Sequence, residues 1–213
     1  MPAVNTADIE RIRTRLSDYE MTIHHADGLY RHLYFHSTTD PFPGNCSFHV
    51  VTWPGHACIH GDWCGAHTIA READMLKDFL NVDHIDRNYW AEKMSIAGHH
   101  QQLTEESQEV CNQWITDRLQ EIEKEFVLND TDRFNIRDEY ESCRDGNGIL
   151  QWEKLQNLGT YVTWEGSEGI HLGIDDAWEL DFTVYRHDFL VACEGLRYAA
   201  ERWAGVNGGA GLS

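Results

Sequence analysis

The sequence of 213 residues carries 36 Asp and Glu against 17 Lys and Arg, a formal net charge of −19 at pH 7. A hydrophobic fraction of 41% with 8 Trp excludes a disordered chain despite this charge, and the length suffices for a buried core. The negative field repels nucleic acid, so it argues against direct nucleic-acid binding and favours a partner with a basic surface.

The sequence predicts a cytoplasmic protein that does not enter a membrane. No apolar run approaches the roughly 18 residues that a spanning helix needs. The first residues, MPAVNTADIERIRTRL, are polar and of mixed charge, which is not the pattern of a secretory signal. The six Cys follow no framework spacing, so we expect reduced thiols.

Periodicity predicts the elements of the N-terminal half. Ile9, Ile12 and Leu16 recur at helical spacing, which predicts a helix within the opening segment. Alternation of apolar and polar residues predicts three strands, over residues 29–36, 46–53 and 56–60. The last two strands flank Pro54-Gly55, a pair that favours a type II turn, and we expect them to form a hairpin. Short helices are predicted over residues 71–80 and 88–97, with Gly98 ending the second.

The C-terminal half opens on the longest helical pattern of the chain. It begins at Thr104 and continues for about 23 residues, with an apolar stripe on one side and acids around the rest. Shorter elements follow, namely helices over residues 137–143 and 150–158 and strands over residues 161–164 and 169–172. A helix over residues 185–203 closes the chain, with an apolar face of Phe189, Cys193, Leu196 and Ala200.

These elements predict an α+β fold. A small antiparallel sheet, made of the N-terminal hairpin and the neighbouring strand, packs with several helices, one of them long, acidic and amphipathic. We expect a single domain over residues 1–204 and a flexible, Gly-rich tail over residues 205–213.

The two faces of the predicted hairpin differ in chemistry. One face is apolar and we expect it to lie against the core with Leu33 and Phe35; it holds Phe48, Val50, Ala57 and Ile59. The other face is polar and aromatic; it holds His32, Tyr34, His36, His49, Val51, Trp53, His56, Cys58 and His60. Two interpretations remain open: a helix covers this face, or the face binds a ligand, for which His49, Trp53 and His60 are the candidate contacts.

Zinc is the cofactor that this face would suit, because zinc binds imidazole and thiolate ligands. The candidate ligands are His56, Cys58 and His60 on the strand, with Cys64 and His67 in the segment that follows. Alternate residues of a strand stand about 7 Å apart, so at most two of the three could reach one ion without help from another segment. The paired spacings typical of structural zinc sites do not occur, which favours a chain without a cofactor.

Signatures of catalysis are absent from the sequence. It contains no G-x-S-x-G elbow, no P-loop and no dinucleotide fingerprint. The acidic residues 130–141 fail the calcium-loop frame, because Phe134 and Asn135 occupy its fifth and sixth positions. The acids at 175–181 suit a helix N-terminus, where Asp181 or Thr183 would cap the last helix. We therefore assign no catalytic residue and favour a binding protein over an enzyme.

Three segments resemble a family of small accessory proteins of tailed phages and prophages. FHVVTWPGHACIHGDW, residues 48–63, is similar to the family signature V-T-W-P-G-x-x-x-I-x-G-D. IDRNYWAEK, residues 85–93, resembles the pattern I-N-x-x-Y-W-x-E-K, and DAWE at 176–179 with the aromatic last helix resembles the family's C-terminal part. The resemblance implies a phage-encoded protein that acts in the host cytoplasm, and it brings no established activity or site residue.

Phage origin and acidity together favour an inhibitor of a host nucleic-acid-binding or defence complex, of the anti-CRISPR or anti-restriction type. An acidic helix can present carboxylates where a DNA-binding groove receives phosphates. The predicted long helix would span about 34 Å, roughly one turn of DNA. The residues predicted to bind the partner are Glu105, Glu106, Glu109, Asp117, Glu121, Glu123 and Glu125.

Other functions fit the same sequence. The His, Cys and Trp face of the hairpin could sequester a nucleotide or second messenger, or could serve a metal-dependent enzyme. The acids of the long helix could also form a solvated face without a partner. The identity of the target and the oligomeric state are left open by the sequence.

Overall fold

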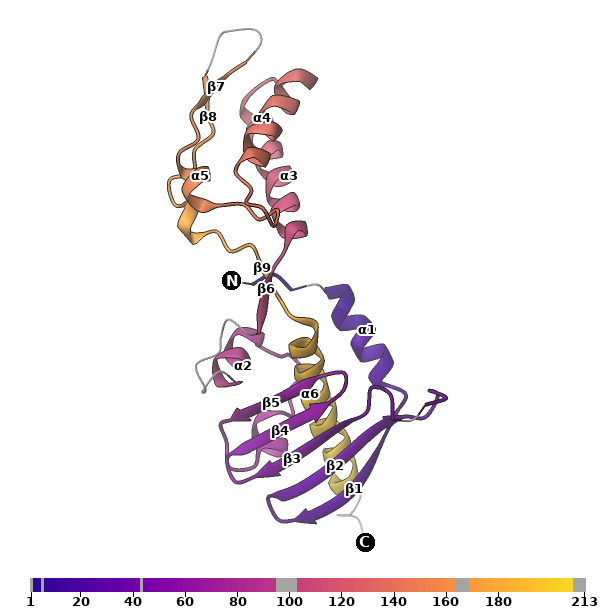
Figure 1. The fold of residues 1–213 in the computed structure, drawn as a ribbon. Coiled ribbons are helices and arrows are strands. Elements are labelled where there is room, and N and C mark those ends of the chain that lie inside the picture. Colours follow the sequence, from indigo (N-terminus) through magenta and orange to yellow (C-terminus); the bar gives the residue numbers. More distant parts are fainter. Residues whose placement is uncertain (1, 5, 43, 95–102, 164–168, 209–213) are drawn as a thin grey trace. The chain divides into compact units, whose positions relative to one another are not determined.

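The computed structural model of the chain describes all residues except 1, 5, 43, 95–102, 164–168 and 209–213 (Figure 1). The chain divides into two compact units. Val4–Thr104 and Tyr185–Ser213 form one of them, called here the sheet unit, and Met1–Ala3 and Glu105–Val184 form the other, called the acidic unit. Whether both units unfold together as the single domain expected over residues 1–204 stays a prediction.

The sheet unit is built around a five-stranded antiparallel sheet in the order β1-β2-β3-β4-β5. Its strands are β1 Tyr19–Asp27, β2 Tyr30–Ser37, β3 Phe48–Trp53, β4 His56–Gly61 and β5 Gly65–Ala70. The predicted hairpin is confirmed, because Trp53 pairs with His56 around Pro54 and Gly55, and Gly55 has the positive φ (81°) of a type II turn. The α+β class is confirmed. The sheet has two strands more than predicted, β1 and β5.

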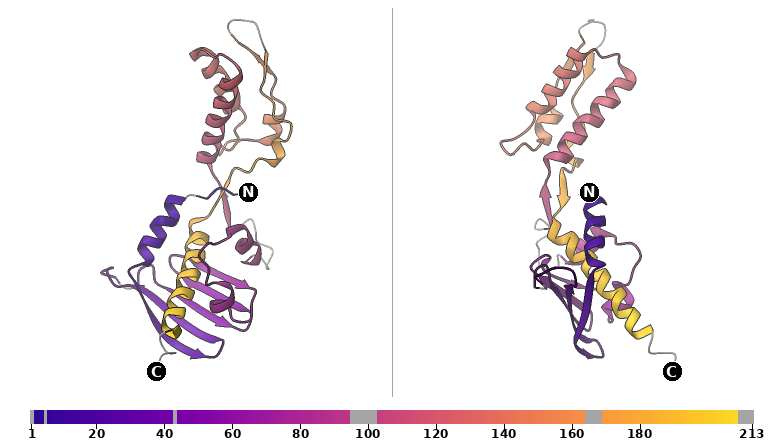
Figure 2. Two further views of the ribbon diagram at one scale, coloured as in Figure 1. Left: turned by 180° about the vertical axis from the view of Figure 1, so that it is seen from behind. Right: turned by 90° about the vertical axis from the view of Figure 1, so that its right-hand side faces the viewer.

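The helices that pack on one face of this sheet include α1 Thr6–Leu16 and α6 His187–Gly208 (Figures 1 and 2). The predicted core residues of the hairpin lie between sheet and helices and are fully buried; they are Leu33, Phe35, Phe48, Val50, Ala57 and Ile59. The predicted apolar face of the last helix is also fully buried. Helix α6 continues through Gly208, past the point where the flexible tail was expected to begin, and residues 209–213 lie outside the described part of the chain.

The helix predicted over residues 71–80 is wrong in extent. Only Met75–Phe79 is helical, as a single π-helical turn labelled η1, in which the Leu80 N–H donates to the Met75 carbonyl at 2.8 Å. Asp74 caps this turn by accepting from the Lys77 N–H. The next predicted helix is present as α2 Arg87–Met94, and its expected end at Gly98 lies outside the described residues.

The acidic unit has its own core, formed by α3 Gln108–Glu125, α4 Asp130–Ser142, α5 Trp152–Gln156 and the β7–β8 hairpin. Strands β7 and β8 cover Thr160–Val162 and Gly169–His171, and a 3-10 turn, η3, covers Ala177–Glu179. The strands β6 Thr104–Glu106 and β9 Thr183–Tyr185 pair where the chain enters and leaves this unit. In the described part of the chain, the helices are too short or too polar to cross a membrane.

The long acidic helix starts later than predicted. Ser107 has extended backbone angles and its side chain accepts from the Val110 N–H, so Ser107 is the N-cap and the helix begins at Gln108. Residues 104–106 form a strand instead. The helix therefore has 18 residues. It spans about 27 Å at a rise of about 1.5 Å per residue, less than the expected 34 Å.

Candidate functional site

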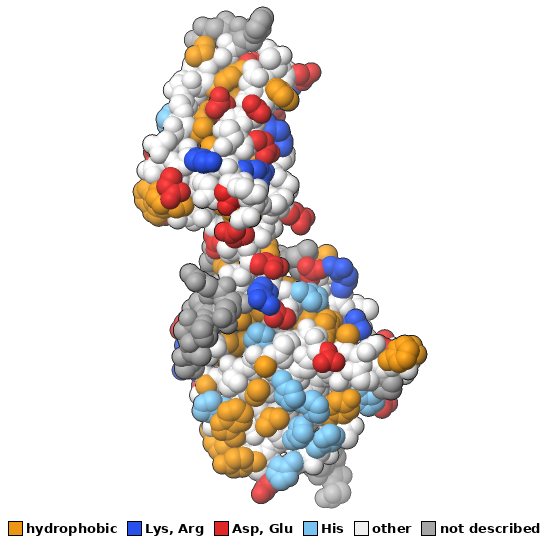
Figure 3. Space-filling model, viewed as in Figure 1, with side chains coloured by type: hydrophobic (Ala, Val, Ile, Leu, Met, Phe, Trp, Pro, Cys, Tyr) orange, Lys and Arg blue, Asp and Glu red, His pale blue; other side chains and the backbone are white. Residues whose placement is uncertain are grey.

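The outer face of the five-stranded sheet, opposite α1 and α6, is the most unusual surface of the sheet unit. We call it the histidine face, and it comprises His24, His32, Tyr34, His36, His49, Val51, Trp53, His56, Cys58 and His60. Each of these residues is partly or fully exposed. Figure 3 shows the imidazoles gathered on this surface with hydrophobic side chains beside them. Of the two interpretations, a covering helix does not come from α1 or α6, because both pack on the other side of the sheet.

Rings on this face pack against one another along and across the strands. His49 lies parallel to His60, with ring centroids 4.9 Å apart, and Tyr34 lies parallel to His36 at 5.5 Å. Tyr34 and His49 are direct partners across β2 and β3, and their ring centroids are 4.7 Å apart. At the other end of the hairpin, Trp53 stacks on His56 at 5.1 Å. The ligand contacts predicted at His49 and His60 are therefore neighbours, whereas Trp53 lies at the end of the strand.

Three imidazoles from three adjacent strands form a compact group on this face. One ring nitrogen each of His24, His32 and His49 lies within 4.8 Å of the others. His32 Nε2 and His49 Nδ1 are 2.9 Å apart, which is a hydrogen bond. Burial lowers the pKa of both His32 and His49, and the nearby imidazoles lower it further. The lowered pKa favours the neutral imidazole, the form in which histidine coordinates metals.

A β-bulge places His24 in this group. The register of β1 against β2 pairs Ile23 with Leu33 and then His25 with His32, so His24 is the extra residue. A bulge puts two residues opposite one and redirects side chains. No strand is predicted over residues 19–27, so His24 is absent from the predicted site residues. Alternation of Tyr19, Met21 and Ile23 is the signal that could have found the strand.

The residues predicted as zinc ligands are not brought together. His56, Cys58 and His60 lie on the histidine face at alternate positions of β4. His67 pairs with Ile59, so its side chain lies on the core side, next to the Phe189 ring. Cys64 is buried in the turn between β4 and β5, where burial raises the pKa of its thiol to about 12. All six cysteines are free.

The characteristic letters of the V-T-W-P-G segment, residues 51–62, are explained by local structure. Thr52 is buried and its hydroxyl donates to the Leu29 carbonyl at 2.9 Å. Gly55 exchanges backbone hydrogen bonds with the segment after β5, at 3.1 Å each. Gly61 lies so close to the neighbouring strand that an added Cβ would be 2.2 Å from the Ser47 carbonyl oxygen. The glycines and the threonine therefore hold the hairpin together, and none of them forms a reactive centre.

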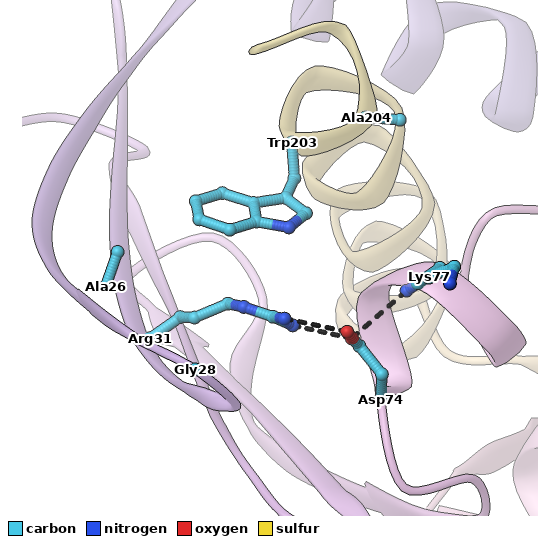
Figure 4. A pocket seen from close by; sticks show the side chains of 7 residues that line it. All are labelled: Ala26, Gly28, Arg31, Asp74, Lys77, Trp203 and Ala204. Atoms are coloured by element: carbon cyan, nitrogen blue, oxygen red, sulfur yellow. Dashed lines mark hydrogen bonds and ion pairs between the residues drawn. The ribbon is translucent and has the colours of Figure 1, made fainter. Parts of the chain in front are cut away.

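The sheet unit also contains a cavity of about 570 Å³ (Figure 4). It is lined by Ala26, Gly28, Arg31, Asp74, Lys77, Trp203 and Ala204. Arg31 donates two hydrogen bonds to Asp74, at 2.5 and 2.7 Å, and this pairing holds the pKa of Asp74 below its usual range. The Arg31 guanidinium lies 4.9 Å from the Trp203 ring centroid. The ion pair neutralises the charges of Arg31 and Asp74, so an anion would find no free guanidinium there. We therefore explain these contacts as structural ones that connect β2, η1 and α6.

The acids predicted to bind a partner lie in two different elements. Glu105 and Glu106 belong to β6, so their assignment to the long helix is wrong. The other five are exposed on α3; they are Glu109, Asp117, Glu121, Glu123 and Glu125. Glu121 pairs with Arg118 at 3.0 Å and Glu123 pairs with Arg133 at 2.5 Å.

The acids before the last helix close a turn instead of capping that helix. Asp181 accepts from the N–H and the hydroxyl of Thr183, at 3.0 and 2.6 Å. Thr183 begins β9, and α6 starts only at His187. The predicted capping of α6 by Asp181 or Thr183 is therefore wrong.

No protein-family model, no curated protein and no solved structure matches this chain. Its function must therefore be inferred from the distribution of its charges and from the geometry of its surfaces.

Proposed function

We propose that the protein binds the basic, nucleic-acid-binding surface of another protein through its acidic unit, and thereby keeps nucleic acid from that surface. The observation that carries the proposal is the distribution of charge between the units. The acidic unit holds 20 Asp and Glu against 6 Lys and Arg, a net charge of −14. The sheet unit holds 16 acids against 11 bases, a net charge of −5.

Two helices, α3 and α4, carry ten of these 20 acids and four of the six bases. In the acidic unit α3 and α4 lie side by side (Figure 1), with the Trp114 ring of α3 meeting the Tyr140 ring of α4 edge to face at 5.4 Å. This contact holds the two helices together over the core, and eight of their ten acids are exposed; Asp132 is buried and Glu141 is partly exposed. A rigid acidic surface loses little conformational entropy on binding, which supports a role in recognition.

Some of these acids are free to meet a partner's cations. Glu109, Asp117 and Glu125 on α3 are exposed and form no ion pair with any described residue, and the same holds for Asp138 and Glu139 on α4. Along the axis of duplex DNA each strand carries one phosphate per about 3.4 Å, so a helix of about 27 Å has the axial length of about eight phosphates of one strand. The match supports mimicry of a short DNA segment.

The resemblance to phage accessory proteins indicates which class of protein the acidic unit would bind. A phage protein that occupies a host nuclease or DNA-binding complex protects the phage genome from it. We therefore place the target among host nucleic-acid-binding or defence complexes, and we propose that the protein acts in the host cytoplasm.

The histidine face supports a second candidate, a module that sequesters a nucleotide or second messenger. The observation that favours it is the open, ring-lined surface around Tyr34 and His49, on which a base could stack. A nucleotide that raises the melting temperature of the wild type, and not of His49→Ala, would support this candidate.

The test of the main proposal compares two variants of equal net charge. One carries Glu109→Lys, Asp117→Lys and Glu125→Lys in the acidic unit. The matched control carries Asp27→Lys, Asp78→Lys and Asp83→Lys, which are exposed residues of the sheet unit. Each protein is immobilised and exposed to host extract at low salt, and bound proteins are then eluted with salt or with duplex DNA.

We expect the wild type and the control to retain a DNA-binding protein that duplex DNA displaces, and the acidic-unit variant to lose it. Retention should also weaken steeply as salt rises, because the contact is between exposed charges. Equal retention by both variants, or recovery of no basic or nucleic-acid-binding protein, would contradict the proposal.

A further inference from the structure

The His24–His32–His49 group has the composition and the spacing of a metal site. Its three potential ligand atoms are all ring nitrogens, and they lie within 4.8 Å of one another before any ion is bound. Each comes from a different strand, so the sheet backbone fixes all three Cα positions. Sites on regular elements hold ligands more closely than sites on loops do.

We infer that His24, His32 and His49 bind one divalent transition-metal ion, and that zinc is the ion this site takes. Imidazole nitrogens suit zinc, copper, nickel and iron, whereas magnesium and calcium require oxygen ligands. Three protein nitrogens leave a fourth position of a tetrahedron to water. The site lies wholly within the sheet unit, so it is independent of the function proposed for the acidic unit.

The geometry needs only small side-chain adjustments. Zn–N bonds of about 2.0–2.1 Å in a tetrahedron place neighbouring nitrogens about 3.3 Å apart. His32 Nε2 and His49 Nδ1, now at 2.9 Å, would separate by a few tenths of an ångström. The third ligand is the adaptable one, because His24 is exposed and can rotate toward the other two without displacing a packed neighbour.

Coordination also requires a change in the position of one proton. The hydrogen bond between His32 and His49 uses one N–H and one lone pair. A metal ion uses the lone pairs of both atoms, so the donor ring must carry its proton on its other nitrogen. This exchange of tautomers, mediated by solvent, releases no proton from neutral rings. A protonated ring must lose one, so binding weakens in acid.

The surroundings favour a cation. Arg31 is the only Lys or Arg in the five strands, and its side chain lies on the opposite face of the sheet, paired with Asp74. Glu20 on β1 pairs with His36 across the strands and adds a carboxylate to the histidine face. A divalent ion at the three imidazoles therefore meets no fixed positive charge from the five strands.

The experiment measures metal uptake by the intact chain after treatment with a chelator. Cobalt is the probe, because its visible spectrum distinguishes tetrahedral from octahedral coordination, and zinc is then used to displace it. The variants are His24→Ala, which removes an exposed side chain and should leave the fold intact, and the double variant His32→Ala/His49→Ala. His56→Ala is the matched control, since His56 lies on the same face and outside the group. A second control, His99→Ala/His100→Ala, removes two adjacent histidines of the sequence that lie outside the described residues.

We expect one cobalt ion per chain with an intense tetrahedral spectrum, displaced by one equivalent of zinc. Loss of a residue that only hydrogen-bonds a metal ligand lowers the affinity for the metal by about 10–100-fold. Loss of the His24 ligand itself should therefore weaken cobalt binding by about 100-fold or more. The His32→Ala/His49→Ala variant should bind no cobalt at this site. Both controls should bind like the wild type.

Three results would overturn the inference. They are the absence of cobalt uptake by the wild type, an affinity for His24→Ala equal to that of His56→Ala, and loss of the tetrahedral spectrum in His99→Ala/His100→Ala. In the first case the His32–His49 contact is a hydrogen bond within a packed ring cluster and nothing more, and in the second case His24 is not a ligand. Circular dichroism of each variant verifies that its fold is retained.

Discussion

The carboxylate of Glu194 is fully buried in the sheet unit and accepts hydrogen bonds from three arginines. Arg13 of α1 donates at 2.8 Å, Arg87 of α2 at 2.6 Å, and Arg197, one turn further along α6, at 3.2 Å. The Arg87 and Arg197 side chains are only 10% and 18% exposed. Removal of the carboxylate would therefore leave at least two guanidiniums away from water without a counter-charge.

We predict that Glu194→Ala lowers the free energy of unfolding by about 3–5 kcal/mol, the usual cost of breaking a buried pair by removing one partner. Glu201→Ala is the matched control, because Glu201 pairs with the same Arg197 at 3.2 Å and is 61% exposed. An exposed pair contributes little, so this control should cost below about 0.5–1 kcal/mol. Glu194→Ala/Arg87→Ala should cost less than the sum of its single changes, since it also removes the most buried cation.

The assay is urea unfolding followed by circular dichroism, with the slope of each transition compared between variants. A Glu194→Ala variant that loses less than about 1 kcal/mol, or no more than Glu201→Ala, would refute the reasoning, because the buried charges would then be compensated in another way.

Three further predictions test other parts of the fold. Gly61→Ala should lower the free energy of unfolding by about 1–3 kcal/mol, because the added Cβ would meet the neighbouring strand. The control Gly44→Ala should be neutral, because the space around Gly44 is open. Equal urea midpoints for the two variants would argue against the close approach at Gly61. Burial lowers the pKa of His67 in the folded chain below its unfolded value of about 6.5. Below about pH 6.5 the unfolded chain therefore binds more protons than the folded chain, and the free energy of unfolding falls as the pH drops toward the folded pKa. His67→Phe should lose less stability than the wild type between pH 7.5 and 5, and parallel pH curves would exclude this role. Asn129→Ala should remove the capping box with Asp132 and cost about 0.5–2 kcal/mol, which hydrogen exchange in α4 can measure, and unchanged exchange would contradict it.

The central strands were predictable because their two faces differ. Leu33, Phe35, Phe48 and Val50 are fully buried, and the residues between them are partly exposed, so alternation is strong. The edge strand β1 lacks this contrast, since beyond Tyr19 and Met21 its residues are exposed on both sides. The periodic signal of such a strand is therefore short, and in β1 it is limited to Tyr19, Met21 and Ile23.

The candidate site could be predicted only in part for the same reason. Strand parity placed His32, His49 and His60 on one face, and the register confirms this. The bulge that adds His24 depends on how β1 pairs with β2, which is a tertiary contact that no local pattern specifies. The start of α3 was misjudged because acids continue through Glu105 and Glu106, and the N-cap at Ser107 received too little weight.

The pairing of β6 with β9 has a consequence for how this chain could change over time. The residues that open and close the acidic unit are held together by backbone hydrogen bonds, such as that from Ser107 N–H to the Phe182 carbonyl at 2.9 Å. A segment whose ends meet in this way is in effect an insertion in the chain of the sheet unit. Such a segment can be exchanged for another, or lost, without disturbing the core of the sheet unit. The sheet unit and the acidic unit could thus be inherited separately, with the sequence of one replaced while the core of the other is preserved.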